Sequence, residues 1–125
     1  MIAFVNATVL TIGLNNRDEV LRELPIRLIK MQSAVKAARS LKTERIDSVI
    51  SKWDLDDMRD GEFLRRLRAV KPTIPTIVLI KGGDISEEIA ARSLGVSAVL
   101  SEEIEDEHFL ETVAAILGLA VPSSG

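Results

Sequence analysis

The sequence predicts an α/β protein in which helices cover both faces of a parallel β-sheet. Strand-like and helix-like segments alternate along the 125 residues and give five strand–helix units. The helical segments between strands are long enough to be crossovers, which join parallel strands. The segment Ile77–Ile80 is apolar at every position, as is typical of a strand buried on both faces.

Five segments rich in aliphatic and β-branched residues predict the strands, because residues that favour turns bound them. In chain order they are Val9–Ile12, Ile26–Met31, Ser48–Lys52, Ile77–Ile80 and Val96–Leu100. Apolar residues at helical spacing predict that the segments between these strands are helices. The predicted helices are a short one that begins at Arg17 and ends before Pro25, then Ser33–Thr43, Gly61–Val70, Ser86–Leu94 and Glu107–Leu119.

Several helix ends carry capping residues. Asn16 and Glu19 have the spacing of an N-cap residue and its reciprocal partner, which places a helix start at Arg17. Either Asp84 or Ser86 is the expected N-cap of the fourth helix. Gly95 suits the left-handed position that commonly ends a helix.

Composition excludes several function classes. The net charge is only −3, so no overall field attracts nucleic acid. The absence of cysteine excludes disulfides, thiol catalysis and cysteine-ligated zinc. His108 is the only histidine, and a lone histidine on an amphipathic helix is more often a surface residue than a metal ligand. We therefore expect neither a metal nor a cofactor.

The length predicts a single domain over residues 1–125. Residues 1–6 are either a leader or an extension of the first strand, and residues 121–125 should fray. The apolar run Met1–Leu14 lacks the basic segment and cleavage site of a signal peptide and is too short to span a bilayer. We expect a cytoplasmic protein with no membrane contact.

In open α/β sheets, ligands bind beyond the carboxyl ends of the strands. A single glycine follows the first strand here, so a phosphate-binding loop and nucleotide binding are not expected. The residues that the strand ends supply are Gly13, Leu14 and Asn15, then Lys52, Trp53 and Asp54, then Ile80, Lys81 and Gly82, and last Ser101 and Glu102.

Four motifs follow one another in the chain: Val49-Ile50-Ser51, Met58 with Asp60-Gly61, Ile74-Pro75, and Gly95-Val96-Ser97-Ala98. In order and spacing they resemble the receiver domain of two-component response regulators, the chemotaxis type included, from Ala7 to about Ala120. The first helix is shorter than in that family, and the Asp54–Asp60 loop has one extra residue. The resemblance implies a flavodoxin-like three-layer sandwich with parallel strand order 2-1-3-4-5.

Receivers carry an aspartyl phosphoacceptor, two acidic Mg²⁺ ligands, a Ser or Thr, and a Lys. The resemblance places Lys52 at the acceptor position, Gly13 and Leu14 at the acidic pair, Ile80 at the hydroxyl position and Glu102 at the lysine position. An ammonium group cannot accept a phosphoryl group, and phosphoryl transfer depends on a divalent cation. The resemblance therefore implies a degenerate pseudo-receiver of a signalling pathway, with no enzymatic activity, that acts by phosphorylation-independent protein–protein interaction.

Two alternatives stay open for the function. The acceptor role could move to Asp54, which lies two residues after Lys52 and points the same way along an extended chain. The chain could also be a flavodoxin-like ligand-binding or enzyme domain.

Lys52 and Glu102 could form an ion pair with the charges of the family's Asp–Lys contact exchanged, or each could point separately into solvent.

The interaction surface is expected near the same strand ends. Trp53 either anchors a partner or packs over its loop. The resemblance places Val99 at the aromatic switch position and Glu103 where a proline follows the family's lysine. It also implies a homodimer through the last two helices and the fifth strand. A signalling protein is the expected partner, and nucleic acid is not.

Overall fold

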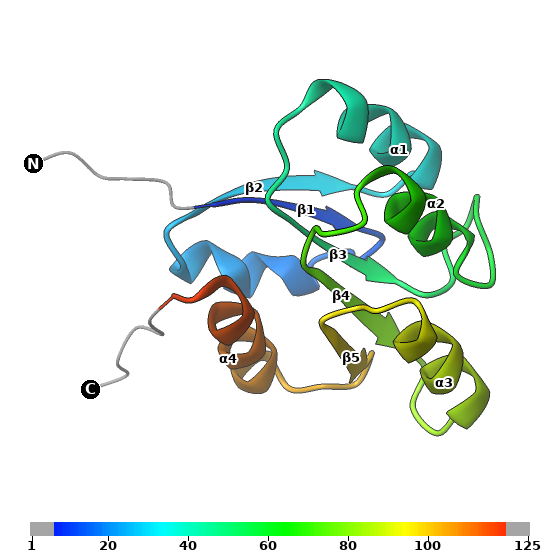
Figure 1. The fold of residues 1–125 in the computed structure, drawn as a ribbon. Helices are drawn as coiled ribbons and strands as arrows, with labels where there is room; N and C mark the ends of the chain where they lie inside the picture. The colour runs from blue at the N-terminus through cyan, green and yellow to red at the C-terminus, as the bar shows by residue number, and fades with distance from the viewer. Residues whose placement is uncertain (1–6, 120–125) are drawn as a thin grey trace, which may run out of the picture.

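A computed structural model describes residues 7–119, which form one five-stranded parallel sheet (Figure 1). The strand order is β2-β1-β3-β4-β5, so the predicted fold class and strand order are confirmed. The strands are β1 (Ala7–Ile12), β2 (Ile26–Met31), β3 (Ser48–Lys52), β4 (Thr76–Ile80) and β5 (Ala98–Ser101). The predictions for residues 1–6 and 121–125 lie outside the described residues.

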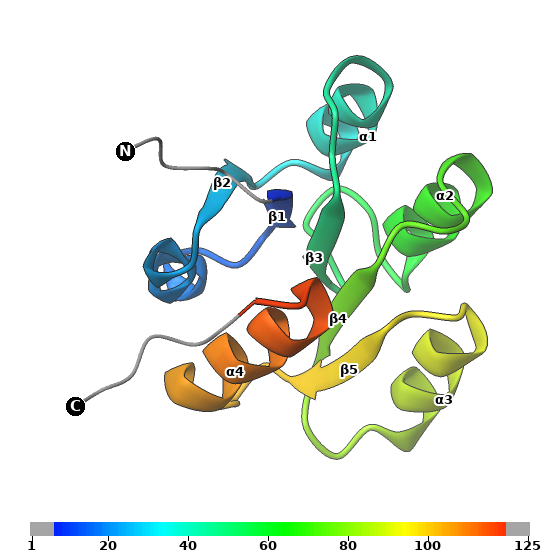
Figure 2. The same cartoon turned by 60° about the vertical axis from the view of Figure 1, so that its left-hand side comes forward.

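The helices form two layers, one on each face of the sheet (Figure 2). They are the 3-10 helix η1 (Arg17–Glu23) and the α-helices α1 (Ala34–Thr43), α2 (Glu62–Val70), α3 (Ile85–Ser93) and α4 (Asp106–Leu117). Helices α1, α2 and α3 cover one face, whereas η1 and α4 cover the other. None of the helices within residues 7–119 is both long enough and apolar enough to cross a membrane.

Successive side chains along each strand point to opposite faces of the sheet, so the core consists of two clusters, one on each face. In β3, Val49 packs toward α1 and α2, whereas Ile50 packs toward η1 and α4. All five residues of β4 are buried, because this strand lies inside the sheet and is covered on both faces. Phe63 of α2 and Phe109 of α4 are the largest fully buried side chains, one in each cluster.

The predicted cap of the first helix is wrong. Asn16 makes no side-chain cap hydrogen bond, because its backbone (φ −104°, ψ 7°) is not in the extended conformation that an N-cap residue needs. The helix does begin at Arg17, as a 3-10 helix. At α3, Asp84 is the cap and accepts a hydrogen bond from the N–H of Glu87 at 3.1 Å.

Two boundaries near the C-terminal end differ from the prediction. Strand β5 begins at Ala98 because that residue is the first to pair with β4, opposite Ile77. Gly95 has φ +76°, as its predicted left-handed position requires. Helix α4 ends at Leu117, because Gly118 adopts φ +71°.

Candidate functional site

The candidate site lies at the carboxyl ends of β1, β3 and β5. Lys52, the last residue of β3, borders two small cavities of about 120 and 80 Å³. The first is lined by Gly13, Asn15, Gln32, Lys52, Asp54, Leu55 and Asp56. The second is lined by Gly13, Leu14, Asn15, Arg17, Lys52, Leu79 and Glu102. The strand ends therefore bring together most of the residues that the sequence placed there.

Lys52 and Glu102 meet across the second cavity. The Lys52 Nζ lies 3.7 Å from the Glu102 Oε1, and the two side chains are 31% and 28% exposed. This distance is an ion-pair contact, longer than a hydrogen bond. The two side chains therefore face each other instead of pointing separately into solvent.

Arg17 adds a second cation to this cavity. Its guanidinium donates hydrogen bonds to the backbone carbonyls of Glu102 and Ile104. The same group lies 3.7 Å from the Asp106 carboxylate and 5.9 Å from the centre of the Phe109 ring. Arg17 thus fastens the start of η1 to the loop that carries Glu102. No local pattern could have predicted this contact, because 85 residues separate its partners.

Neither Gly13 nor Leu14 presents a polar side chain to the cavities. Gly13 has φ +72°, and a Cβ added there would lie 2.6 Å from the Leu55 Cδ2. Leu55 is 2% exposed and occupies the space that a side chain at position 13 would need. Leu14 is 3% exposed and packs into the core cluster that contains Leu21 and Phe109.

The other positions that the sequence resemblance singled out, apart from Glu102, hold apolar or solvent-facing side chains. Ile80 is buried in the core cluster beneath α1, α2 and α3. Val99 is partly buried and packs against the same cluster. Glu103 is exposed, and its backbone N–H donates to the Ser101 Oγ at 3.1 Å.

Trp53 is buried, so the prediction that it anchors a partner is wrong and the alternative, packing over its loop, is correct. The side chain is 5% exposed. A Cβ added at Gly61 would lie 2.4 Å from the Trp53 Cη2. The ring therefore lies directly against the Gly61 backbone, where only glycine leaves room for it.

The aspartates between β3 and α2 have structural partners. The Asp57 carboxylate accepts hydrogen bonds from the backbone N–H groups of Ala34 and Val35, at 2.9 and 3.0 Å, and from the Ser33 hydroxyl at 2.9 Å. The Val35 N–H, followed by that of Ala34, holds the pKa of the Asp57 carboxyl below its usual range. Asp57 therefore caps α1 from a different loop.

Asp54, the alternative acceptor, lines the first cavity with Lys52. Its Oδ1 accepts a hydrogen bond from the backbone N–H of Asp60 at 2.7 Å, which closes the loop. Within residues 7–119, no three His, Cys, Asp or Glu side chains converge closely enough to hold a metal ion.

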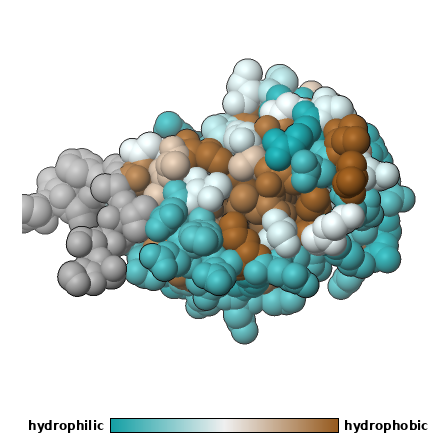
Figure 3. All heavy atoms as spheres, turned by 90° about the horizontal axis from the view of Figure 1, so that it is seen from below, coloured by the Kyte–Doolittle hydropathy of each residue, from teal (hydrophilic) through white to brown (hydrophobic). Residues whose placement is uncertain are grey.

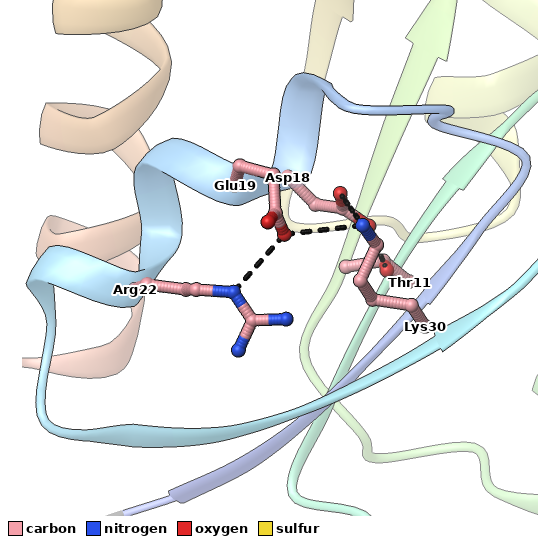
Figure 4. Close-up of polar contacts among 5 residues, drawn as sticks. All are labelled: Thr11, Asp18, Glu19, Arg22 and Lys30. Carbon is pink, nitrogen blue, oxygen red and sulfur yellow. Dashed lines mark hydrogen bonds and ion pairs between the residues drawn. The ribbon is translucent and has the colours of Figure 1, made fainter.

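A second polar cluster holds η1 on the sheet (Figure 4). The Asp18 carboxylate is almost fully buried and accepts a hydrogen bond from the Thr11 hydroxyl at 2.5 Å. The Lys30 Nζ lies 3.3 Å from Asp18 and 3.1 Å from Glu19, which also contacts Arg22. Glu19 and then Asp18 raise the pKa of Lys30. This cluster compensates a buried charge and lies apart from the cavities.

No model of a known protein family matches the chain. The transcriptional regulatory protein GlrR of Escherichia coli K12 is 25% identical over 97 residues, which cover 78% of this chain and 22% of GlrR. The chain thus spans about a fifth of the length of its curated relatives.

Two solved structures illustrate the likeness in fold. A CheY-like response regulator receiver domain protein from Methanospirillum hungatei JF-1 has a TM-score of 0.80 and 14% identity, over 90% of this chain and 94% of that one. The receiver domain of the sensor histidine kinase PA1611 from Pseudomonas aeruginosa PAO1, with magnesium in its active-site cleft, has a TM-score of 0.76 and 17% identity, over 90% and 98%. The chain therefore has the CheY-like fold of response-regulator receiver domains.

Proposed function

We propose that this chain is a receiver-like module of two-component signal transduction that acts by phosphorylation-independent protein–protein interaction. The observation that carries this function is the contact of Lys52 with Glu102, 3.7 Å apart at the ends of β3 and β5. In the PA1611 receiver, the active-site cleft holds magnesium. A divalent cation in the corresponding cleft of this chain would face the Lys52 ammonium, which repels it.

The surroundings of Lys52 also favour a site without phosphoryl chemistry. Phosphoryl transfer to a carboxylate needs a cation held by acidic ligands. Leu55 takes up the space next to Gly13, and Leu14 is part of the core. Lys52 would instead form an ion pair with Glu102, and the Arg17 guanidinium would donate hydrogen bonds to the backbone of the same loop. The ion pair would then keep these loops in one conformation.

The surface of α3, β5 and α4 is the candidate docking face. Ile85 and Ile89 are 73% and 64% exposed, and they lie one helical turn apart on α3. Strand β5 is at the edge of the sheet and its apolar residues are only partly buried. Figure 3 shows hydrophobic residues gathered on this side of the molecule. Such a patch is typical of a protein-interaction surface.

We expect this face to bind a signalling protein or a second copy of the chain. Replacing the exposed Ile89 by lysine (Ile89→Lys) should turn a homodimer into a monomer in sedimentation experiments. The matched change at α1, Val35→Lys, should leave the dimer intact, since Val35 is also exposed but lies elsewhere. A wild-type chain that stays monomeric would reject the homodimer and leave a different protein as the partner.

A phosphodonor assay tests the proposed function. The protein is incubated with acetyl phosphate and Mg²⁺, and its intact mass is measured. The expected result is an unmodified protein. A hydroxylamine-sensitive adduct of one phosphoryl group would overturn the proposal, and loss of that adduct in Asp54→Asn would establish the shifted acceptor.

The two cavities beside Lys52 do not favour the flavodoxin-like enzyme or ligand-binding alternative. Small-molecule pockets usually enclose about 300–1,000 Å³. The two cavities beside Lys52 have volumes of about 120 and 80 Å³. They are too small for a cofactor of the size of a flavin mononucleotide.

A further inference from the structure

A groove of about 260 Å³ runs between α1 and α2, away from the site and from the α3–β5–α4 face. It is lined by Ala38, Leu41 and Lys42 of α1 and by Phe63, Arg66, Leu67, Ala69 and Val70 of α2. Its floor is apolar, because Leu41, Phe63 and Leu67 belong to the core. Val70 at its edge is 52% exposed and extends the apolar surface of the groove toward solvent.

Positive charge is concentrated on the two helices that form this groove. Half of the chain's 16 lysines and arginines lie in segments 34–45 and 62–71, with only two acidic residues, although the whole chain has a net charge of −3. These cations are Lys36, Arg39, Lys42, Arg45, Arg65, Arg66, Arg68 and Lys71. Each helix contributes one of them to the groove lining, Lys42 from α1 and Arg66 from α2.

The two cations that line the groove differ in whether they already have an ion-pair partner. Arg66 Nη2 lies 2.8 Å from Glu62 Oε2, one turn earlier on α2, so its side chain is already oriented. Lys42 is exposed, and its ammonium has no ion-pair partner among residues 7–119. An apolar floor between two cations is complementary to a helix with an apolar stripe and acidic flanks.

We propose that the α1–α2 groove binds an acidic amphipathic helix of a partner protein. The apolar side chains of that helix lie on Leu41, Phe63 and Val70, and its carboxylates pair with Lys42 and Arg66. The groove shares no lining residue with the two cavities beside Lys52 and lies outside the proposed docking face, so the proposed binding needs no phosphoryl chemistry at Lys52.

Two other occupants fit the groove less well. Helix α4 of a second copy is acidic, but its apolar residues Phe109, Leu110 and Val113 are buried in its own core. Helix α3 exposes Ile85 and Ile89 beside acidic residues, but seating it in the groove would be a head-to-tail contact, which gives rings or open chains of copies instead of a closed dimer. Single-stranded nucleic acid binds through exposed aromatic side chains as well as cations. The groove's one aromatic residue, Phe63, is 1% exposed and cannot stack on a base.

A labelled synthetic peptide is the probe that tests this proposal. The peptide carries leucine at positions i, i+3, i+4 and i+7 of a helix and glutamate on both flanks. Fluorescence anisotropy should show saturable binding that weakens with salt. A peptide with lysine in place of glutamate should not bind. A failure of the acidic peptide to bind, or its displacement by a single-stranded RNA of the same length, would overturn the proposal.

Matched variants locate the binding surface. Lys42→Glu should weaken binding about threefold to tenfold, because one attractive pair becomes repulsive. Lys36→Glu makes the same charge change on α1 outside the groove lining and should have a smaller effect. Val70→Lys should weaken binding, whereas Val35→Lys should not. Equal losses within either pair would indicate non-specific attraction and reject the groove. A phosphoryl adduct in the assay above would leave these results unchanged.

Discussion

At the scale of single residues, the proposed function rests mainly on the contact between Lys52 and Glu102. Each is about 30% exposed, so the pair is neither a buried ion pair nor a freely solvated one. Pairs of this kind contribute up to about 1 kcal/mol. The contact therefore orients the β5–α4 loop more than it stabilises the fold.

A double-mutant cycle measures that contact. Lys52→Ala, Glu102→Ala and the double variant should show a coupling of about 0.5–1 kcal/mol in the free energy of unfolding. The helical pair Arg92–Glu88, whose side chains are 61% and 51% exposed, is the control and should couple more weakly. Additive effects at Lys52 and Glu102 would mean that the two charges act independently.

The packing of Trp53 on Gly61 gives a second prediction at this scale. Gly61→Ala should cost about 1–3 kcal/mol, because the residue has φ +72° and the added Cβ would collide with the ring. Gly83→Ala is the control, since Gly83 has φ +87° but no atom lies within 4 Å of its added Cβ. Urea unfolding followed by the fluorescence of Trp53, the only tryptophan, gives both values. Equal losses would show that the collision contributes nothing.

Individual elements show which features the sequence could predict. The bounds of β3 and the start of α1 follow from local patterns, and the structure agrees with them within one residue. Asn16 has the right spacing for a cap but the wrong backbone angles, which only the surrounding loop determines. The contacts of Arg17 and Asp57 join segments that are distant in the sequence, so no spacing rule could reveal them.

The α1 cap supplied by Asp57 makes stability depend on pH. The pKa of Asp57 is lowered in the folded chain, so its contribution is present above the unfolded value of about 4 and is lost as the pH falls further. Asp57→Asn should lower the free energy of unfolding at pH 7 by about 1 kcal/mol. Below pH 4, the free energy of unfolding of this variant should decrease less than that of the wild type. Urea unfolding across this range measures both effects.

Asp56→Asn is the control for that experiment. Asp56 is the neighbouring exposed aspartate, and its carboxylate accepts no hydrogen bond within residues 7–119. Its replacement should leave both the stability at pH 7 and the acid dependence close to those of the wild type. An identical effect of the two substitutions would show that general charge, and not the cap on α1, controls the acid response.

At the scale of the whole molecule, the strand order and the two helical layers are those of a receiver, as the motif order implied. The surface properties were harder to predict. Trp53 is buried because Gly61 accommodates it, whereas Ile85, Ile89 and Val70 are exposed because α3 and α2 carry apolar residues on their outer sides. The molecule thus has two candidate surfaces for partners, the α1–α2 groove and the face of α3, β5 and α4.

The most direct test of the central claim is a two-dimensional NMR titration of the wild-type protein with Mg²⁺ and then beryllium fluoride, a stable mimic of an aspartyl phosphate. Because the Lys52 ammonium would repel a cation and no three acidic or imidazole side chains within residues 7–119 converge to hold one, the backbone amide signals should not shift in a saturable way. Saturable shifts that extend from the Lys52 cavities to β5 and α3 would instead show a working phosphoryl switch and contradict the account.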